Sequence, residues 1–306
     1  QGYSWGEQPK TSTNLIKLNT NENPYPPSPN VIRALQTLDT EGLRTYPNPL
    51  ADELREEVAK LNRIADENVV ITNGGDEGLR LSLTTFVDPG ETVCFADPSY
   101  SLYPVLAAIQ GANIKPVAYS DGWEIPETFP EKIKSFDAKM SYLVNPHAPS
   151  GNFYSLGALD KIAQSAPGVL LIDEAYADFI DPSLNYQSAD LLKKYDNVLI
   201  LRTFSKGYSL AGIRLGYLMG SEALISPIIS KTRDSYNVGS IQQRLGTAAI
   251  TDQEYSKKIW KKIRENRTHL QDRLTALGLT SNPSQSNFIL VEIDNQRVNA
   301  HSLYLS

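Results

Sequence analysis

Short apolar runs alternate with amphipathic stretches from about residue 51 onward, and this alternation constrains the fold of the 306-residue chain most strongly. The runs are rich in Val, Ile and Leu and end at Gly, Pro, Asn or Asp. Strands buried on both faces have this composition, because helices cover both sides of a parallel sheet. We therefore predict an α/β fold with a mainly parallel central sheet. Its predicted strands are NVVIT, TVCFAD, MSYLVN, VLLIDE and NVLILRTF.

Helical periodicity and changes in composition divide the chain further. Apolar residues between 54 and 64 are spaced by four, three and three positions, which predicts a helix with one stripe against the sheet. Residues 252–278 predict one long helix ended by glycine, followed by a strand at QSNFILVEI. The Asn- and Pro-rich start predicts an extended arm before a short helix. We predict a large α/β domain over 37–248 and a smaller α+β domain built from 1–36 and 249–306.

Charge and cysteine content exclude several classes of protein. The formal net charge of −6 argues against binding along a phosphate backbone, so we expect no nucleic-acid partner. No run reaches the ~20 apolar residues of a membrane span. The single cysteine, Cys94, cannot form a disulfide within the chain, which favours a reducing compartment such as the cytoplasm. The three histidines lack metal-ligand spacing, so we predict no metal site.

Chemically active residue types follow each predicted strand at its end. In open α/β sheets, ligands bind outside the carboxyl ends of the strands, so these residues should share one rim. They are Asn73-Gly74-Gly75-Asp76-Glu77, Pro98-Ser99-Tyr100, Asn145-Pro146, Asp173-Glu174-Ala175-Tyr176 and Thr203-Phe204-Ser205-Lys206.

Each of these groups has an ordinary interpretation beside a functional one. The Gly-Gly turn at a helix start could hold a phosphate on free N–H groups, or could simply join a strand to a helix. A partly desolvated Lys206 favours a neutral amine that forms a Schiff base, whereas a lysine taken alone is more commonly on the surface. Asp173 could cap a helix. Beside a lysine, a phosphate cradle and Arg214, it could instead pair with a pyridinium nitrogen.

Eight segments in order carry a resemblance to a known family. The chain resembles the fold-type I pyridoxal-phosphate aminotransferases, most closely the branch that acts on histidinol phosphate. The segments are LNTNENPYPPSP, RTYPNPL, NGGDEGLRL, DPSYSLY, NPHAPSG, DEAYADF, TFSKGYSLAGIRLGY and SNFIL.

The resemblance implies a role for each residue around the cofactor ring. Lys206 would hold pyridoxal 5'-phosphate through a Schiff base and later move the substrate proton. Asp173 would keep the ring nitrogen protonated. Tyr176 and Asn145 would hydrogen-bond the ring hydroxyl oxygen, and Tyr100 would stack on the ring face.

The resemblance also implies a phosphate site, a shared subunit interface and a substrate lid. The residues expected around the phosphate are Gly75, Asp76, Glu77, Thr203, Ser205 and Arg214. Tyr46 would reach the phosphate of the neighbouring subunit, which implies a homodimer. Asn23 and Tyr25 would lie over the substrate. Arg233 could contact a substrate phosphate or could lie at a solvated helix end.

Two departures from the family pattern stand out. The family commonly reads Asn-Pro-Asn-Asn-Pro-Thr-Gly where this chain has NPHAPSG, so His147, Ala148 and Ser150 are substitutions. Asn145 remains in place, and we keep its predicted role. The family's substrate-clamping arginine has no match, because the only arginine after Asn282 is Arg297, in a different context. We expect that arginine beyond the last residue given.

The resemblance predicts a specific transamination. Histidinol phosphate and 2-oxoglutarate would be converted reversibly into imidazole-acetol phosphate and glutamate, a reaction of histidine biosynthesis. Alternatives on the same fold are an aromatic or other amino-acid aminotransferase and a threonine-phosphate-type decarboxylase. A cofactor-binding regulator without turnover ranks below them, because Lys206, Asp173 and Arg214 are all present.

Overall fold

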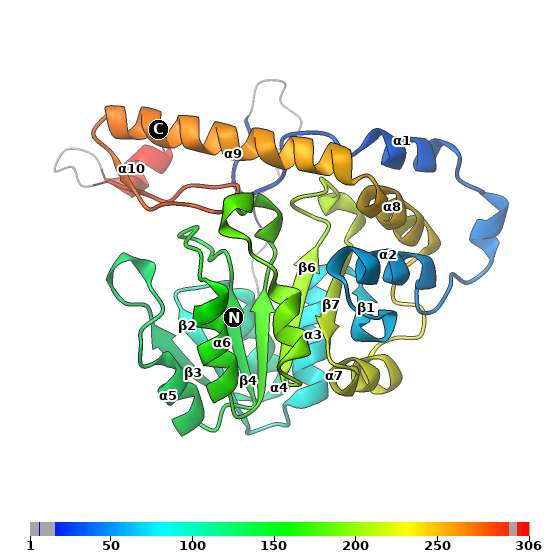
Figure 1. Ribbon diagram of the computed structural model, residues 1–306, viewed down its shortest axis with the longest axis horizontal. Coiled ribbons are helices and arrows are strands. Elements are labelled where there is room, and N and C mark those ends of the chain that lie inside the picture. The colour runs from blue at the N-terminus through cyan, green and yellow to red at the C-terminus, as the bar shows by residue number, and fades with distance from the viewer. Residues whose placement is uncertain (1–5, 7–15, 294–298, 306) are drawn as a thin grey trace.

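The computed structural model describes residue 6, residues 16–293 and residues 299–305. A seven-stranded sheet of order β1-β7-β6-β5-β4-β2-β3 forms its centre (Figure 1). Strand β7 runs antiparallel to β1 and β6, and every other neighbouring pair is parallel. The strands are β1 (Val69–Thr72), β2 (Thr92–Asp97), β3 (Asn113–Ala118), β4 (Met140–Val144), β5 (Val169–Asp173), β6 (Val198–Thr203) and β7 (Gly216–Gly220). The mainly parallel sheet and all five predicted strands are confirmed.

Two strands of the sheet, β3 and β7, were not predicted. Strand β3 lies at the sheet edge, where its mostly exposed residues and Pro116 are tolerated. Strand β7 begins and ends with glycine, which weakens its strand signal. Gly216 is needed there, because a Cβ atom would lie 2.9 Å from the carbonyl oxygen of Arg202.

Helices cover both faces of the sheet. They are α1 (Pro29–Gln36), α2 (Asp52–Asn62), α3 (Gly74–Phe86), α4 (Leu102–Gln110), α5 (Phe129–Ser135), α6 (Leu156–Ser165), α7 (Glu222–Pro227), α8 (Ser240–Thr251), α9 (Gln253–Ala276) and α10 (Ala300–Leu305). Successive residues of a strand point to opposite faces of the sheet, and each face carries its own hydrophobic core. Leu170 and Ile172 of β5 pack with α2, α5, α6 and α8. Leu171 packs with α3, α4 and α7 on the other face.

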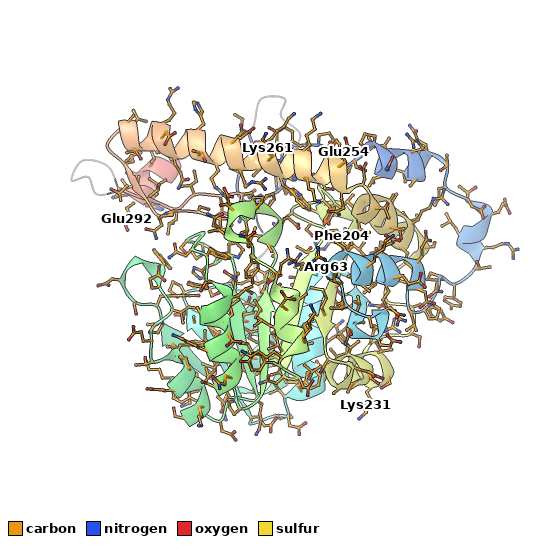
Figure 2. The ribbon with its side chains drawn as sticks, in the orientation of Figure 1. Arg63, Phe204, Lys231, Glu254, Lys261 and Glu292 are labelled. Carbon is orange, nitrogen blue, oxygen red and sulfur yellow. The ribbon has the colours of Figure 1, made fainter. Side chains whose placement is uncertain are left out.

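The long helix α9 lies across the carboxyl end of the sheet (Figure 1). Figure 2 shows Glu254 and Lys261 along this helix and Phe204, which is fully buried, below it at the end of β6. The predicted long helix is confirmed, and Gly278 follows its end with a φ of 79°. The arm from residue 16 to 28 precedes α1 without forming a helix or strand, but it is not fully extended, because it turns at residues 19–20 and Asn21 has a φ of 52°. The earlier part of that prediction lies outside the described residues apart from residue 6.

The strand predicted at residues 285–293 is mostly wrong. Only β9 (Val291–Glu292) forms, and it pairs with β8 (Thr280–Ser281). In the segment before β9, the Ser284 hydroxyl accepts a hydrogen bond from the Ser286 backbone N–H. The Ser286 hydroxyl accepts one from the Phe288 backbone N–H. Such local side-chain bonds compete with a strand ladder. The predicted division into two domains stays a prediction.

The described part of the chain holds neither a candidate membrane span nor a candidate metal site. Within the described residues, no helix is long and apolar enough to cross a membrane. Among those same residues, no three His, Cys, Asp or Glu side chains gather where they could hold a metal ion.

Candidate active site

Lys206 lies at the carboxyl end of the sheet, directly after β6. Its ammonium donates to the backbone oxygen of Thr20 at 2.6 Å and lies 5.7 Å from the centre of the Tyr176 ring. Burial lowers the pKa of Lys206 from its ordinary value to about 8, helped by Arg214 and opposed by Glu22. A lysine with this pKa releases its proton far more readily near neutral pH than an exposed one.

Asp173 ends the neighbouring strand β5 and is 5% exposed. Its Oδ2 accepts a hydrogen bond from the Tyr103 hydroxyl at 2.8 Å, and its Oδ1 accepts from the Ala175 backbone N–H at 3.1 Å. Burial raises the pKa of Asp173 to about 6, while these two hydrogen bonds favour the ionised form. A carboxylate held in apolar surroundings binds a cationic N–H group strongly. Tyr103 was missed at the sequence level, where only its place in DPSYSLY pointed to it.

An anion cradle forms between the start of α3 and the turn after β6. Arg214 donates to the Ser205 hydroxyl at 3.3 Å and pairs with Asp76 at 3.3 Å. The Thr203 hydroxyl bonds that of Ser205 at 3.0 Å, so Thr203 orients the cradle. Gly74 has a φ of 80°, and a Cβ atom on it would lie 2.8 Å from an Arg214 nitrogen. A guanidinium, a hydroxyl and the N–H groups of a helix start fit a phosphate.

Asp76 and Glu77 have different surroundings. Tyr100 donates to one oxygen of Asp76 at 3.1 Å, which ties Tyr100 to the cradle. The Glu77 carboxylate accepts from the Asn73 backbone N–H at 2.6 Å and from Asn237 at 2.7 Å. The Glu77 side chain therefore holds the glycine turn in place, and the predicted cofactor contact of Glu77 stays a prediction.

Asn145 is fully buried and is held by Tyr154 and Tyr186. Its amide nitrogen donates to the Tyr154 backbone oxygen at 3.1 Å and to the Tyr186 hydroxyl at 2.9 Å. Its amide oxygen accepts from the Tyr154 backbone N–H at 2.8 Å. Both N–H groups of the amide thus bond to the protein, and the predicted contact of Asn145 with the ring hydroxyl oxygen stays a prediction. The sequence could not show these hydrogen bonds, since Tyr154 and Tyr186 approach only in the folded chain.

Tyr186 also contacts a buried ion pair, which the sequence did not predict. The Tyr186 hydroxyl donates to Glu174 at 2.5 Å, and Glu174 pairs with Arg202 at 2.7 Å. The Glu174 side chain is fully buried. Through Tyr186, this network connects Asn145, which follows β4, with Glu174, which follows Asp173 at the end of β5.

The N-terminal arm covers Lys206 and Tyr176. Asn23 donates to the backbone oxygen of Lys206 at 3.0 Å, and its predicted place over the substrate stays a prediction. Asn21, which was not predicted, donates to the Tyr176 hydroxyl at 3.2 Å. The Tyr25 hydroxyl accepts from Asn266 of α9 at 3.0 Å. The arm is therefore anchored both to the lysine turn and to α9.

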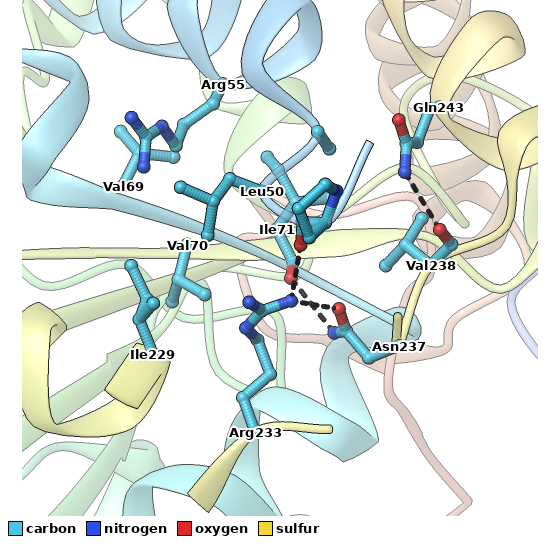
Figure 3. Close-up of a pocket in the computed structure, with 12 residues that line it drawn as sticks. Leu50, Arg55, Val69, Val70, Ile71, Ile229, Arg233, Asn237, Val238 and Gln243 are labelled. Atoms are coloured by element: carbon cyan, nitrogen blue, oxygen red, sulfur yellow. Dashed lines mark hydrogen bonds between the residues drawn. The ribbon is translucent and has the colours of Figure 1, made fainter. Parts of the chain in front are cut away.

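Arg233 and Tyr46 do not join this set of residues. Arg233 donates to the Pro49 backbone oxygen at 2.7 Å and to Asn237 at 2.8 Å, in the pocket of Figure 3. These bonds fix Arg233 at the turn that contains Pro49, and its possible contact with a substrate phosphate stays a prediction. Tyr46 is 80% exposed and stacks on Tyr236, with ring centres 4.5 Å apart.

The chain is similar to known proteins along most of its length. The family model "Aminotransferase class I and II" matches residues 13–304. A curated histidinol-phosphate aminotransferase of Rippkaea orientalis is 42% identical over 291 residues, which cover 94% of this chain and 80% of that protein. Another, of Microcystis aeruginosa, is 41% identical and covers 99% of this chain and 83% of that protein.

A solved structure agrees with these sequence relatives. The histidinol-phosphate aminotransferase of Sinorhizobium meliloti in complex with pyridoxal-5'-phosphate has a TM-score of 0.84 and 27% identity, and the match covers 90% of this chain and 75% of that one.

Proposed function

Because the chain belongs to the class I and II aminotransferase family, we propose that it transfers the amino group of histidinol phosphate to 2-oxoglutarate. The products are imidazole-acetol phosphate and glutamate, and the cofactor is pyridoxal 5'-phosphate. One observation carries the proposal: a lysine with a lowered pKa follows β6 directly after the Ser205 of a cradle suited to phosphate, and the neighbouring strand β5 ends at a buried carboxylate.

The contacts of each residue indicate its role in the proposed reaction. When bound, pyridoxal phosphate supplies an aldehyde that reacts with amines and a ring that draws electrons from the substrate. Lys206 removes the proton from the substrate α-carbon, for which a pKa of about 8 suits it. Asp173 accepts the N–H of the ring nitrogen and keeps that nitrogen protonated. Arg214, Ser205 and the start of α3 bind the phosphate.

Tyr176, Tyr100 and the arm complete the proposed site. The Tyr176 hydroxyl, which accepts from Asn21, would hydrogen-bond the ring hydroxyl oxygen of the bound cofactor. Tyr100, which bonds Asp76, would stack on the ring face. The arm excludes water from Lys206, because its anchors on the lysine turn and α9 hold it across that side chain.

We also infer a homodimer in which Tyr46 reaches the phosphate of the partner subunit. Tyr46 is 80% exposed, Leu43 45% and Tyr236 47%, and large exposed apolar side chains that gather in this way mark protein contacts. Cys94 is buried and has no second cysteine to pair with, which is compatible with the cytoplasm as the place of action.

Steady-state rates with competing substrates test the proposed function. Histidinol phosphate should give a kcat/KM well above those of phenylalanine and threonine phosphate, with 2-oxoglutarate as acceptor. Negligible turnover of histidinol phosphate beside good turnover of another donor would move the chain to a related enzyme of the same fold. Lys206→Ala should lose both turnover and the visible absorbance of lysine-bound cofactor.

A further inference from the structure

His147 is fully buried in the loop that follows β4, at one of the positions where the chain departs from the family pattern. Its Nε2 lies 3.1 Å from the Pro98 carbonyl oxygen, and its Nδ1 lies 2.8 Å from the Ser150 hydroxyl. The ring packs against Tyr119, with ring centres 4.4 Å apart, and against Trp123 at 5.8 Å. The mechanism above uses none of these contacts.

The partners of His147 determine which nitrogen carries the proton. A carbonyl oxygen only accepts, so Nε2 must donate to Pro98. In the neutral ring the proton on Nε2 leaves Nδ1 as an acceptor, so the Ser150 hydroxyl donates to Nδ1, while the Ser150 oxygen accepts from the Asn152 backbone N–H at 3.2 Å. Donors and acceptors therefore run in one direction from Asn152 through Ser150 and His147 to Pro98. Burial lowers the pKa of His147 to about 4, so this neutral form persists at physiological pH.

This chain of hydrogen bonds joins two loops at the carboxyl end of the sheet. Pro98 lies two residues before Tyr100 and directly after β2. On the opposite side, Asn152 donates to the backbone oxygens of Gly122 at 2.8 Å and Trp123 at 3.2 Å, which anchors the His147 loop to the protein. His147 therefore transmits the position of an anchored loop to the segment that carries Tyr100.

The far side of that segment is held by independent contacts. The Tyr100 hydroxyl bonds Asp76, and its ring meets the Tyr103 ring edge-on with centres 5.7 Å apart. Tyr103 in turn bonds Asp173. Tyr100 thus lies between the anion cradle and Tyr103, which bonds the buried carboxylate of Asp173. The backbone that carries Tyr100 is bonded to the His147 loop at the Pro98 carbonyl oxygen.

We propose that His147, as the neutral Nε2–H tautomer, is a positioning residue that sets the Tyr100 ring over the cofactor through the Pro98 carbonyl. The inference rests on the proposed function, because it takes Tyr100 as the residue that stacks on the ring. It assigns a role to His147, a buried residue that the proposed mechanism does not otherwise use.

The tautomer is tested directly by nitrogen NMR. In the purified chain labelled with 15N-histidine, with and without added pyridoxal phosphate, the His147 resonances should show a protonated Nε2 and an unprotonated Nδ1 between pH 6 and pH 8. His147→Gln assigns these resonances by their loss. A protonated Nδ1, or a charged ring at pH 7, would overturn the proposal.

The positioning role is tested by a double-mutant cycle on the loaded protein. His147→Phe keeps a flat ring but removes the donor, and should weaken pyridoxal phosphate binding about five- to tenfold in equilibrium dialysis. If His147 acts through Tyr100, the change should add little to the loss caused by Tyr100→Ala. His147→Gln, which places an N–H donor at a similar reach, should restore most of the affinity, whereas His147→Asn should not.

The controls separate the possible failures. His269→Phe changes an exposed histidine of α9 and should leave binding unchanged. Fully additive losses in the cycle, or unchanged binding by His147→Phe while the wild type binds normally, would overturn the inference alone. A wild type that binds no pyridoxal phosphate would refute the proposed function and with it any positioning of Tyr100 toward the cofactor.

Discussion

Replacing Lys206 with methionine should stabilise the cofactor-free chain, although it removes the residue on which activity depends. Lys206 is partly buried, and burial lowers its pKa from 10.5 to about 8. The unfolded chain therefore binds this proton more tightly than the folded chain. A tenfold difference in proton affinity is worth ~1.4 kcal/mol, so below pH 8 the folded state loses about 3 kcal/mol.

The substitution Lys206→Met also removes one hydrogen bond, which lowers the expected gain in stability. Methionine cannot donate to the Thr20 backbone oxygen, a bond of 2.6 Å that contributes about 1 kcal/mol. The expected net gain for Lys206→Met is therefore about 2 kcal/mol at pH 7. The sign follows from the lowered pKa: the penalty in the wild type is full below pH 8, falls between pH 8 and pH 10.5, and is absent above it.

Urea unfolding of the cofactor-free proteins at several pH values measures this difference. Lys257→Met serves as the control, since Lys257 is an exposed lysine of α9, and its effect should stay within about 0.5 kcal/mol. The gain for Lys206→Met should shrink as pH rises toward 10.5. A difference that does not change with pH, or a loss of stability at pH 7, would refute the reasoning about Lys206.

Three further predictions concern the groups around Lys206. Tyr103→Phe removes a hydrogen bond to the ionised form of Asp173 and should raise the pKa of that carboxyl further, so cofactor affinity should fall more at pH 6 than at pH 8 in dialysis. Arg214→Ala should weaken pyridoxal phosphate binding about 10- to 100-fold while leaving pyridoxal, which lacks the phosphate, nearly unaffected. Glu174→Gln leaves Arg202 without its buried partner and should cost about 3–5 kcal/mol in urea unfolding; a change under ~1 kcal/mol would show that the pair is not desolvated.

The fold was predictable where burial is uniform along a strand. The runs of β1, β4, β5 and β6 are almost entirely buried, so each reads as a continuous apolar segment. Strand β3 alternates irregularly at the sheet edge, and the segment after Ser284 satisfies its backbone with its own hydroxyls. Neither has the periodicity that defines a strand in sequence.

The positions of the candidate site residues were predictable where they follow the end of a strand. Lys206, Asp173 and Arg214 belong to segments whose position on the rim is fixed by the sheet itself. The functions of Asn145 and Glu77 depend instead on which donors reach them from distant segments. Tyr103 was missed for the same reason, because its hydroxyl meets Asp173 from 70 residues away in the chain.

The half-reaction of the loaded enzyme with histidinol phosphate tests the central claim most directly. In the absence of 2-oxoglutarate, one equivalent of histidinol phosphate should convert the lysine-bound cofactor into pyridoxamine phosphate and yield one equivalent of imidazole-acetol phosphate. Lys206→Ala should show no such conversion on the same time scale. If the wild-type spectrum stays unchanged with histidinol phosphate while phenylalanine converts the cofactor, the assignment of substrate is contradicted.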